Sequence, residues 1–137
     1  MIVADTGAVL ALIDSSDRHH RVMLDLFEED PAAWVLPWAI LPEVDYLLGT
    51  HVSARAQGAF LRDLAASAFQ VEWGREADID RAHVLCRKYA ALRIGLVDAV
   101  VAAVAERVHA TAIATLDLRD FGAMRIAGAP RLLPRDR

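Results

Sequence analysis

The sequence predicts an α/β fold of three layers, in which a central, mostly parallel sheet is flanked by helices on both faces. Short apolar segments typical of strands alternate with longer segments of helical periodicity along the whole chain. Apolar residues make up 55% of the 137 residues and charged residues 25%, which is enough to build one buried core. No repeat, low-complexity tract or linker interrupts the chain, so we expect a single domain over residues 1–137.

The first half of the chain contains two predicted strands and four predicted helices. The first strand is an apolar run that ends at Asp5, and Pro37 bounds the second. Pro31 ends one helix, and Pro42 lies in the first turn of another, where proline is favoured. The strands are expected at residues 1–4 and 32–37, and the helices at 8–13, through VMLDLF to about Glu29, at 41–49 and at 53–66.

The second half of the chain continues the alternation. The segment FQVEW alternates apolar and polar residues as a strand does, and TAIATL is a short buried strand. Residues 76–92 carry an apolar stripe at helical spacing, and residues 96–108 form an almost wholly apolar helix. The segment DLRDFGA is expected to be a loop, and a last short strand is expected near residues 131–133.

Composition excludes several classes of protein. The net charge of −4 does not favour general binding to nucleic acid. Cys86 is the only cysteine, so the chain cannot form an internal disulfide. No apolar run is long enough to cross a membrane, and no basic region precedes the first apolar segment as in a signal peptide. We therefore expect a cytoplasmic protein that does not associate with membranes.

Four carboxylates are predicted to meet at one edge of the sheet. Asp5 and Asp117 follow predicted strands, and Glu43 and Asp98 lie in the first turns of predicted helices. Ligands bind at the carboxyl edge in open parallel sheets. Each acid taken alone could simply cap a helix or complement its dipole. Together they would repel one another, and that repulsion calls for a cation.

Mg²⁺ and Mn²⁺ are the ions that fit a site built from carboxylate oxygens. Such ions activate water and support displacement at phosphorus. Other catalytic patterns are absent: the sequence has no G-x-S-x-G, no phosphate-binding G-x-x-x-x-G-K-[ST] and no G-x-G-x-x-G. One cysteine and five scattered histidines do not form a zinc-ligand pattern.

The motifs around these acids resemble those of PIN-domain ribonucleases, in particular the small VapC-type toxins of type II toxin–antitoxin pairs. The motifs are D-T-G-A-x-x-A-L from Asp5, P-E-V from Pro42, G-L-V-D-A from Gly95 and T-L-D-x-x-D-F from Thr115. Their order and the chain length match, and the resemblance covers the chain from Ile2 to about Leu133. It implies a PIN-like fold and an endoribonuclease that depends on Mg²⁺ or Mn²⁺. It also implies an antitoxin partner and a homodimer.

The family's acidic residues carry over onto Asp5, Glu43, Asp98 and Asp117. The resemblance implies that Asp5 and Asp98 hold the metal, with Glu43 and Asp117 contributing directly or through water. Thr6 and Thr115 match the family's hydroxyl residues and could hold a carboxylate or a metal-bound water in place. Asp120 lies three residues beyond Asp117 and could share the role of the last acid.

Arginines near the acids are candidates for binding the RNA backbone, because an acidic site cannot attract RNA by itself. Arg93 precedes the helix of Asp98, Arg119 lies in the segment of Asp117, and Arg18 lies at the start of the second predicted helix. The alternative for each is ordinary solvent exposure.

Two other functions stay open at this point. A metal-dependent phosphatase of similar α/β build is one, although Asp5-Thr6-Gly7 departs from the Asp-x-Asp of haloacid-dehalogenase-like enzymes. A PIN-like module that has lost catalysis and only binds is the other, and the presence of all four acids argues against it.

Overall fold

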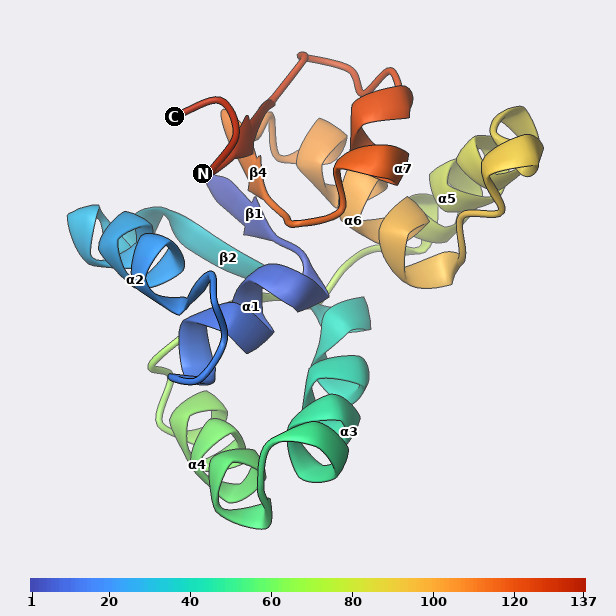
Figure 1. Cartoon of the computed structure of the whole chain (residues 1–137). Helices are drawn as coiled ribbons and strands as arrows, with labels where there is room; N and C mark the ends of the chain where they lie inside the picture. Colours follow the sequence, from blue (N-terminus) through green and yellow to red (C-terminus); the bar gives the residue numbers. More distant parts are fainter.

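The computed structural model describes all 137 residues and is built on a five-stranded sheet (Figure 1). The strand order is β3-β2-β1-β4-β5, and every neighbouring pair is parallel. The three-layer α/β class predicted from the sequence is confirmed. The strands are β1 Ile2–Ala4, β2 Trp34–Pro37, β3 Gln70–Glu72, β4 Ala112–Ala114 and β5 Arg131–Leu133.

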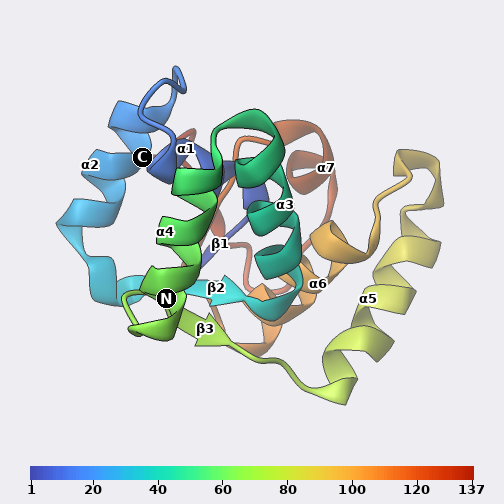
Figure 2. The same ribbon diagram turned by 90° about the horizontal axis from the view of Figure 1, so that it is seen from below.

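Seven α-helices connect and cover these strands. Figure 2 shows α5 and the turn that leads to α6 extending to one side of the molecule, as they do in Figure 1. Chain termini lie near the sheet (Figure 1). The helices are α1 Thr6–Ile13, α2 His20–Glu29, α3 Leu41–His51, α4 Ala54–Ala65, α5 Glu76–Lys88, α6 Leu96–Arg107 and α7 Leu118–Ala123.

The strand order creates a switch point between β1 and β4. The chain moves from β1 to β2 and β3 in one direction, and then crosses back to β4 and β5 on the other side of β1. Because parallel crossovers are almost always right-handed, the reversal of direction places α1–α4 on one face and α5–α7 on the other. In open α/β sheets, ligands bind outside the carboxyl ends of the two strands where the direction reverses. This topology directs attention to Asp5 and to the segment after β4.

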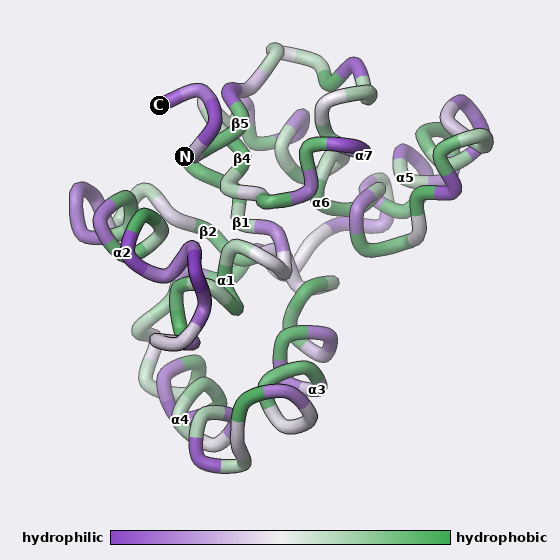
Figure 3. Tube along the Cα trace, in the orientation of Figure 1, coloured by the Kyte–Doolittle hydropathy of each residue, from purple (hydrophilic) through white to green (hydrophobic).

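Helix α6 forms the centre of one layer. Its residues from Ala99 to Ala105 are all buried, and the helix packs against α5, β1, β2 and α7. A helix that is apolar on every side needs such complete cover. Figure 3 shows the hydrophobic colour along the strands and polar positions on the outer turns of α2, α4 and α5. The core therefore runs from the sheet into α6.

A buried ion-pair network ties α6 to α5 and β3. The Arg107 guanidinium donates to both carboxylate oxygens of Asp78, at 2.7 and 2.9 Å, and to Glu72 at 2.8 Å. Asp78 is only 2% exposed. Burial opposes its ionisation, but hydrogen bonds from Arg107 and from the Arg75 N–H outweigh this effect and hold the pKa of Asp78 below its usual value.

Most of the predicted helices and strands are found in the structure, but one segment predicted as a loop is a helix. The segment DLRDFGA, predicted as a loop, forms α7, because Asp117 caps the helix and Phe121 is buried beneath it. The helix predicted over residues 76–92 ends at Lys88 and is followed by a separate 3₁₀ turn over Ala90–Leu92. Helix α3 continues past Gly49 to His51. No helix has the length and apolar character that crossing a membrane requires.

Candidate active site

Asp5 occupies the carboxyl end of the central strand β1. Its backbone N–H donates to the carbonyl of Ala114 at 2.9 Å, which extends the β1–β4 ladder to this residue. Its side chain is buried, at 5% exposure, and caps α1. Oδ1 accepts from the Thr6 N–H at 2.8 Å, and Oδ2 accepts from the Thr115 hydroxyl at 3.0 Å. Both carboxylate oxygens are therefore fixed by the protein.

The hydroxyl of Thr115 joins Asp5 to the segment after β4. Thr115 is fully buried, and its Oγ1 donates to Asp5 and accepts from the Asp117 N–H at 3.0 Å. The sequence suggested that Thr115 could hold a carboxylate or a metal-bound water, and in the structure its hydroxyl contacts the carboxylate of Asp5. Thr6 differs, because it serves Asp5 through its backbone N–H while its own hydroxyl is buried without a hydrogen-bond partner.

Asp117 begins α7 and positions a second acid. Its Oδ1 accepts from the Asp120 N–H at 3.0 Å, so Asp117 is both a helix cap and a member of the acidic group. This bond brings the first turn of α7 close to the end of β4. Phe121, at 2% exposure, anchors the turn in the core.

Three partly buried carboxylates lie closest together: Asp98, Asp117 and Asp120. Each offers one oxygen within 4.8 Å of the others. Asp98 comes from the first turn of α6 and the other two from α7, so two helix N-termini point their acids at one space. The group differs from the predicted pair of Asp5 and Asp98, since Asp120 belongs to it and Asp5 lies outside it.

Burial and, to a smaller extent, electrostatic repulsion perturb the ionisation of Asp98 and Asp5. Burial raises the pKa of Asp98 to about 7, and the charges of Asp5, Asp117 and Asp120 add to this shift. Burial also raises the pKa of Asp5 to about 6. Hydrogen bonds from Thr6 and Thr115 oppose that increase, while the charges of Asp117 and Glu43 support it. Shifts of this size cluster at functional sites.

The donor set fits a divalent cation. Oδ1 of Asp120 is buried and has no hydrogen-bond partner, and the nearest guanidinium nitrogen, Nε of Arg119, is 3.9 Å from it. A buried carboxylate oxygen without a partner is costly, and an ion among the three acids would satisfy it. Oxygen-only ligands suit Mg²⁺ and Mn²⁺.

The remaining residues predicted for the site lie at different distances from it. Glu43 is exposed in the first turn of α3, outside the close group, although its charge acts on Asp5. Arg119 is exposed beside Asp120, and Arg93 is exposed before α6 with a left-handed backbone, φ 53°. Arg18 is exposed in the turn between α1 and α2, and its Nε donates to Nε2 of His19 at 3.1 Å.

Comparison with known proteins places this arrangement in a family. The family model described as "PIN domain" matches residues 2–126. The chain belongs to the PIN domain family. This PIN domain chain is also 34% identical over 130 residues to Ribonuclease VapC26 of Mycobacterium tuberculosis, covering 95% of this chain and 96% of the relative.

Solved structures of this type share the fold. Mycobacterium tuberculosis VapC20, described as a Sarcin-Ricin loop cleaving toxin, superposes with a TM-score of 0.81 at 21% identity, covering 90% of this chain and 95% of the other. DNA-bound VapBC from Salmonella typhimurium gives a TM-score of 0.71 at 19% identity, and the match covers 96% of this chain and 97% of the other. The PIN architecture of this chain is thus found in proteins that retain little of its sequence.

Proposed function

We propose that this PIN domain protein is a metal-dependent endoribonuclease and the toxin of a toxin–antitoxin pair. The observation that carries the proposal is the group of Asp98, Asp117 and Asp120 at the switch point. Asp5, at the end of β1, is held by the hydroxyl of Thr115. Clustered acids with raised pKa values and a buried carboxylate oxygen without a partner suit an ion that acts on phosphodiesters. The name of the relative Ribonuclease VapC26 supports RNA as the substrate.

Each acid has a proposed role. Asp98, Asp117 and Asp120 hold Mg²⁺ or Mn²⁺, with Asp5 and Glu43 contributing directly or through water. When bound, the ion lowers the pKa of water and stabilises negative charge developing on the phosphate. Thr115 keeps Asp5 oriented, because its hydroxyl donates to Oδ2 of that residue. A carboxylate of the group accepts the proton of the attacking water, and cleavage leaves a 5′-phosphate and a 3′-hydroxyl.

The RNA backbone is proposed to contact Arg93 and Arg119, which flank the acids. Both side chains are exposed and come from segments adjoining α6 and α7. Arginine pairs with phosphate oxygens in a bidentate manner. Arg18, exposed in the turn between α1 and α2, is a further proposed contact to the RNA backbone.

An antitoxin and a second copy of the chain are the proposed protein partners. The descriptions of similar structures name VapBC assemblies and a toxin–antitoxin complex from Klebsiella pneumoniae. Exposed aromatic residues give further support, because Tyr46 on α3 and Trp73 after β3 are 65% and 74% exposed. Large exposed aromatics are typical of interaction surfaces.

RNA cleavage with added Mg²⁺ or Mn²⁺ tests the proposal. The wild type should cut RNA, whereas Asp5→Ala and Asp98→Asn should lose at least about 100-fold in rate, since each removes part of the charge that holds the ion. Asp80→Asn, an exposed acid on α5, is the matched control and should cut at the wild-type rate. Undiminished cleavage by both site variants would refute the assignment.

The same assay separates the rival functions. Hydrolysis of a phosphomonoester with RNA left intact would indicate a phosphatase. A folded protein that binds RNA or an antitoxin without cleaving RNA under any divalent ion would indicate a silent binding module. Arg93→Ala and Arg119→Ala should weaken RNA cleavage without lowering the melting temperature, and wild-type rates in both would remove these residues from the proposed RNA path.

A further inference from the structure

A cleft separate from the acids lies near the C-terminal end of the chain. It has a volume of about 730 Å³ and lies between the C-terminal half of α7, the loop before β5 and the chain end. Its lining consists of Phe121, Gly122 and Met124 together with nine residues between Arg125 and Asp136. The proposed catalytic chemistry leaves this cleft without a role.

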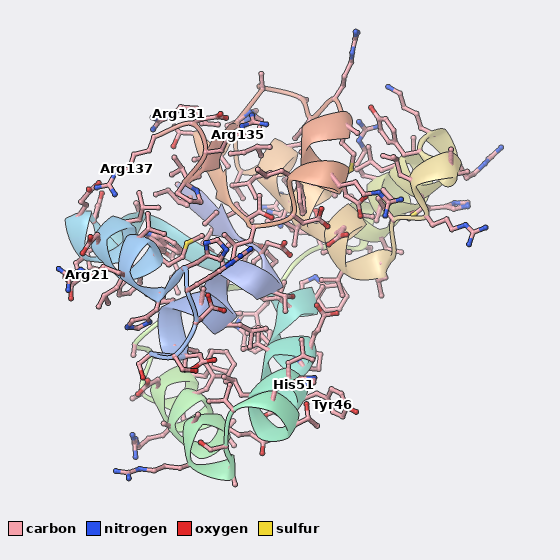
Figure 4. All side chains as sticks on the ribbon, in the orientation of Figure 1. Arg21, Tyr46, His51, Arg131, Arg135 and Arg137 are labelled. Carbon is pink, nitrogen blue, oxygen red and sulfur yellow. The ribbon has the colours of Figure 1, made fainter.

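Positive charge is concentrated in this part of the chain. The last 13 residues contain four arginines and a single acid, Asp136, in a protein whose net charge is −4. Three of those arginines, Arg125, Arg131 and Arg135, line the cleft. Figure 4 shows Arg131, Arg135 and Arg137 on one side of the molecule, away from Tyr46 and His51 on α3. The cleft is therefore a basic site on an acidic protein.

The arginines of the cleft fall into two kinds. Arg135 is held by Asp136 through two hydrogen bonds of 2.6 and 2.8 Å, and its guanidinium lies beside Gly122 of α7. Arg125 and Arg131 are exposed and form no ion pair. Asp136 pairs with one guanidinium, so Arg125 and Arg131 line the cleft without a carboxylate partner within ion-pair distance. Unpaired arginines in a cleft are suited to phosphate oxygens.

Helix α7 connects this cleft to the acids. Its N-terminal turn carries Asp117 and Asp120, and Gly122 and Met124 at its other end line the cleft. The helix has six residues and is about 9 Å long. A polynucleotide whose scissile phosphate lies at the acids can reach the cleft within a few nucleotides.

We propose that the α7–β5 cleft binds backbone phosphates of the RNA substrate a few nucleotides from the scissile bond, through Arg125 and Arg131. This inference rests on the proposed ribonuclease function. The cleft supplies the positive charge that the acidic group lacks, so it attracts the RNA backbone that the carboxylates repel. Contacts to phosphates position the strand and carry no sequence preference of their own.

The test compares Arg125→Gln/Arg131→Gln with the control Arg55→Gln/Arg62→Gln, which removes two exposed arginines from α4 and gives the same net charge. Binding of a labelled RNA of about 20 nucleotides is measured by fluorescence anisotropy in EDTA over a KCl series. Each phosphate contact on a single strand adds about 0.7 to the salt slope, so the cleft variant should lose about 1.4 in slope and about 25-fold in affinity at 0.1 M salt. The control should match the wild type.

Cleavage kinetics give the second readout. The cleft variant should show a raised KM and an unchanged kcat on the long RNA, and wild-type behaviour on a dinucleotide, whose only phosphate is the scissile one. Equal salt slopes in the cleft variant and the control would overturn the proposal. Loss of antitoxin binding with unchanged RNA affinity would also overturn it, and would assign the cleft to an acidic peptide. Failure of the wild type to cut RNA would instead reject the proposed function.

Discussion

Replacing Asp98 with asparagine should stabilise the metal-free protein while abolishing its activity. The substitution keeps the size of the side chain and removes one charge from a region that also holds Asp5, Asp117 and Asp120. Most substitutions in buried positions destabilise a protein. A gain in stability at this position would therefore be evidence that the ionised Asp98 carboxylate is destabilised, by burial and by the neighbouring acids, in a way that a bound cation would relieve.

The magnitude follows from the pKa of Asp98, which rises from 3.8 to about 7. A shift of about three units corresponds to about 4 kcal/mol of unfavourable free energy once the group is ionised. Asp98 is partly exposed and its titration is coupled to its neighbours, so about half of that value, about 2 kcal/mol, is expected to remain. For a domain of this size, about 2 kcal/mol corresponds to a rise of about 7 °C in melting temperature.

The stabilisation should depend on pH in a defined direction. Since the folded pKa of Asp98 lies above its unfolded value, the folded protein binds more protons than the unfolded chain between about pH 4 and pH 7. Wild-type stability therefore falls as the pH rises through this window. Asparagine does not titrate, so the advantage of Asp98→Asn should be close to zero at pH 4 and complete by pH 8.

Thermal unfolding in EDTA at pH 4, 6 and 8 measures the difference in melting temperature between Asp98→Asn and the wild type. The control Asp80→Asn removes an exposed charge and should leave the melting temperature unchanged. Adding Mn²⁺ should raise the melting temperature of the wild type more than that of Asp98→Asn, because binding to the folded form alone stabilises it. A gain in melting temperature that is absent at pH 8, or equal at all three pH values, would refute the argument that ionised Asp98 destabilises the metal-free fold.

Three further changes probe the supports of the site. Thr115→Val should cost about 1–3 kcal/mol, because it leaves Asp5 and the Asp117 N–H without their buried partner, and should slow RNA cleavage about 10–100-fold; Thr115→Ser should restore both. Arg107→Ala should lower the free energy of unfolding in urea by about 3 kcal/mol, since Asp78 keeps a buried charge. Asp120→Asn should weaken Mn²⁺ binding in calorimetry, and wild-type affinity would exclude Asp120 as a ligand.

The sequence predicted the fold and the place of the site because both depend on local patterns. Short apolar strands that end in aspartate are visible directly in the residues before Asp5 and Asp117. The carboxyl-edge rule then placed these acids together without knowledge of the strand order. The structure adds that β1 and β4 are neighbours at the switch point, which only long-range pairing could establish.

The part of the site that the sequence left ambiguous is α7. In DLRDFGA the charges and the glycine suggest a loop, and six residues are too few for a clear helical period. The helix forms because Asp117 caps it and Phe121 packs into the core, and the second of these is a tertiary effect. Formation of α7 determines which acids lie close to Asp98, because a helical turn brings Asp120 alongside Asp117.

The apolar character of α6 has a consequence for catalysis. Seven successive buried residues, Ala99 to Ala105, leave the helix no freedom to rotate or slide, because any shift would open cavities against the sheet and α5. Asp98 lies in the first turn, immediately before this buried stretch, and therefore has a fixed origin. Thr115 fixes Asp5 and Asp117 in the same way from the sheet. Acids that would repel one another in a mobile loop are thus held together by a buried helix and by the end of the central sheet, at an energetic cost that is reflected in the raised pKa values of Asp5 and Asp98.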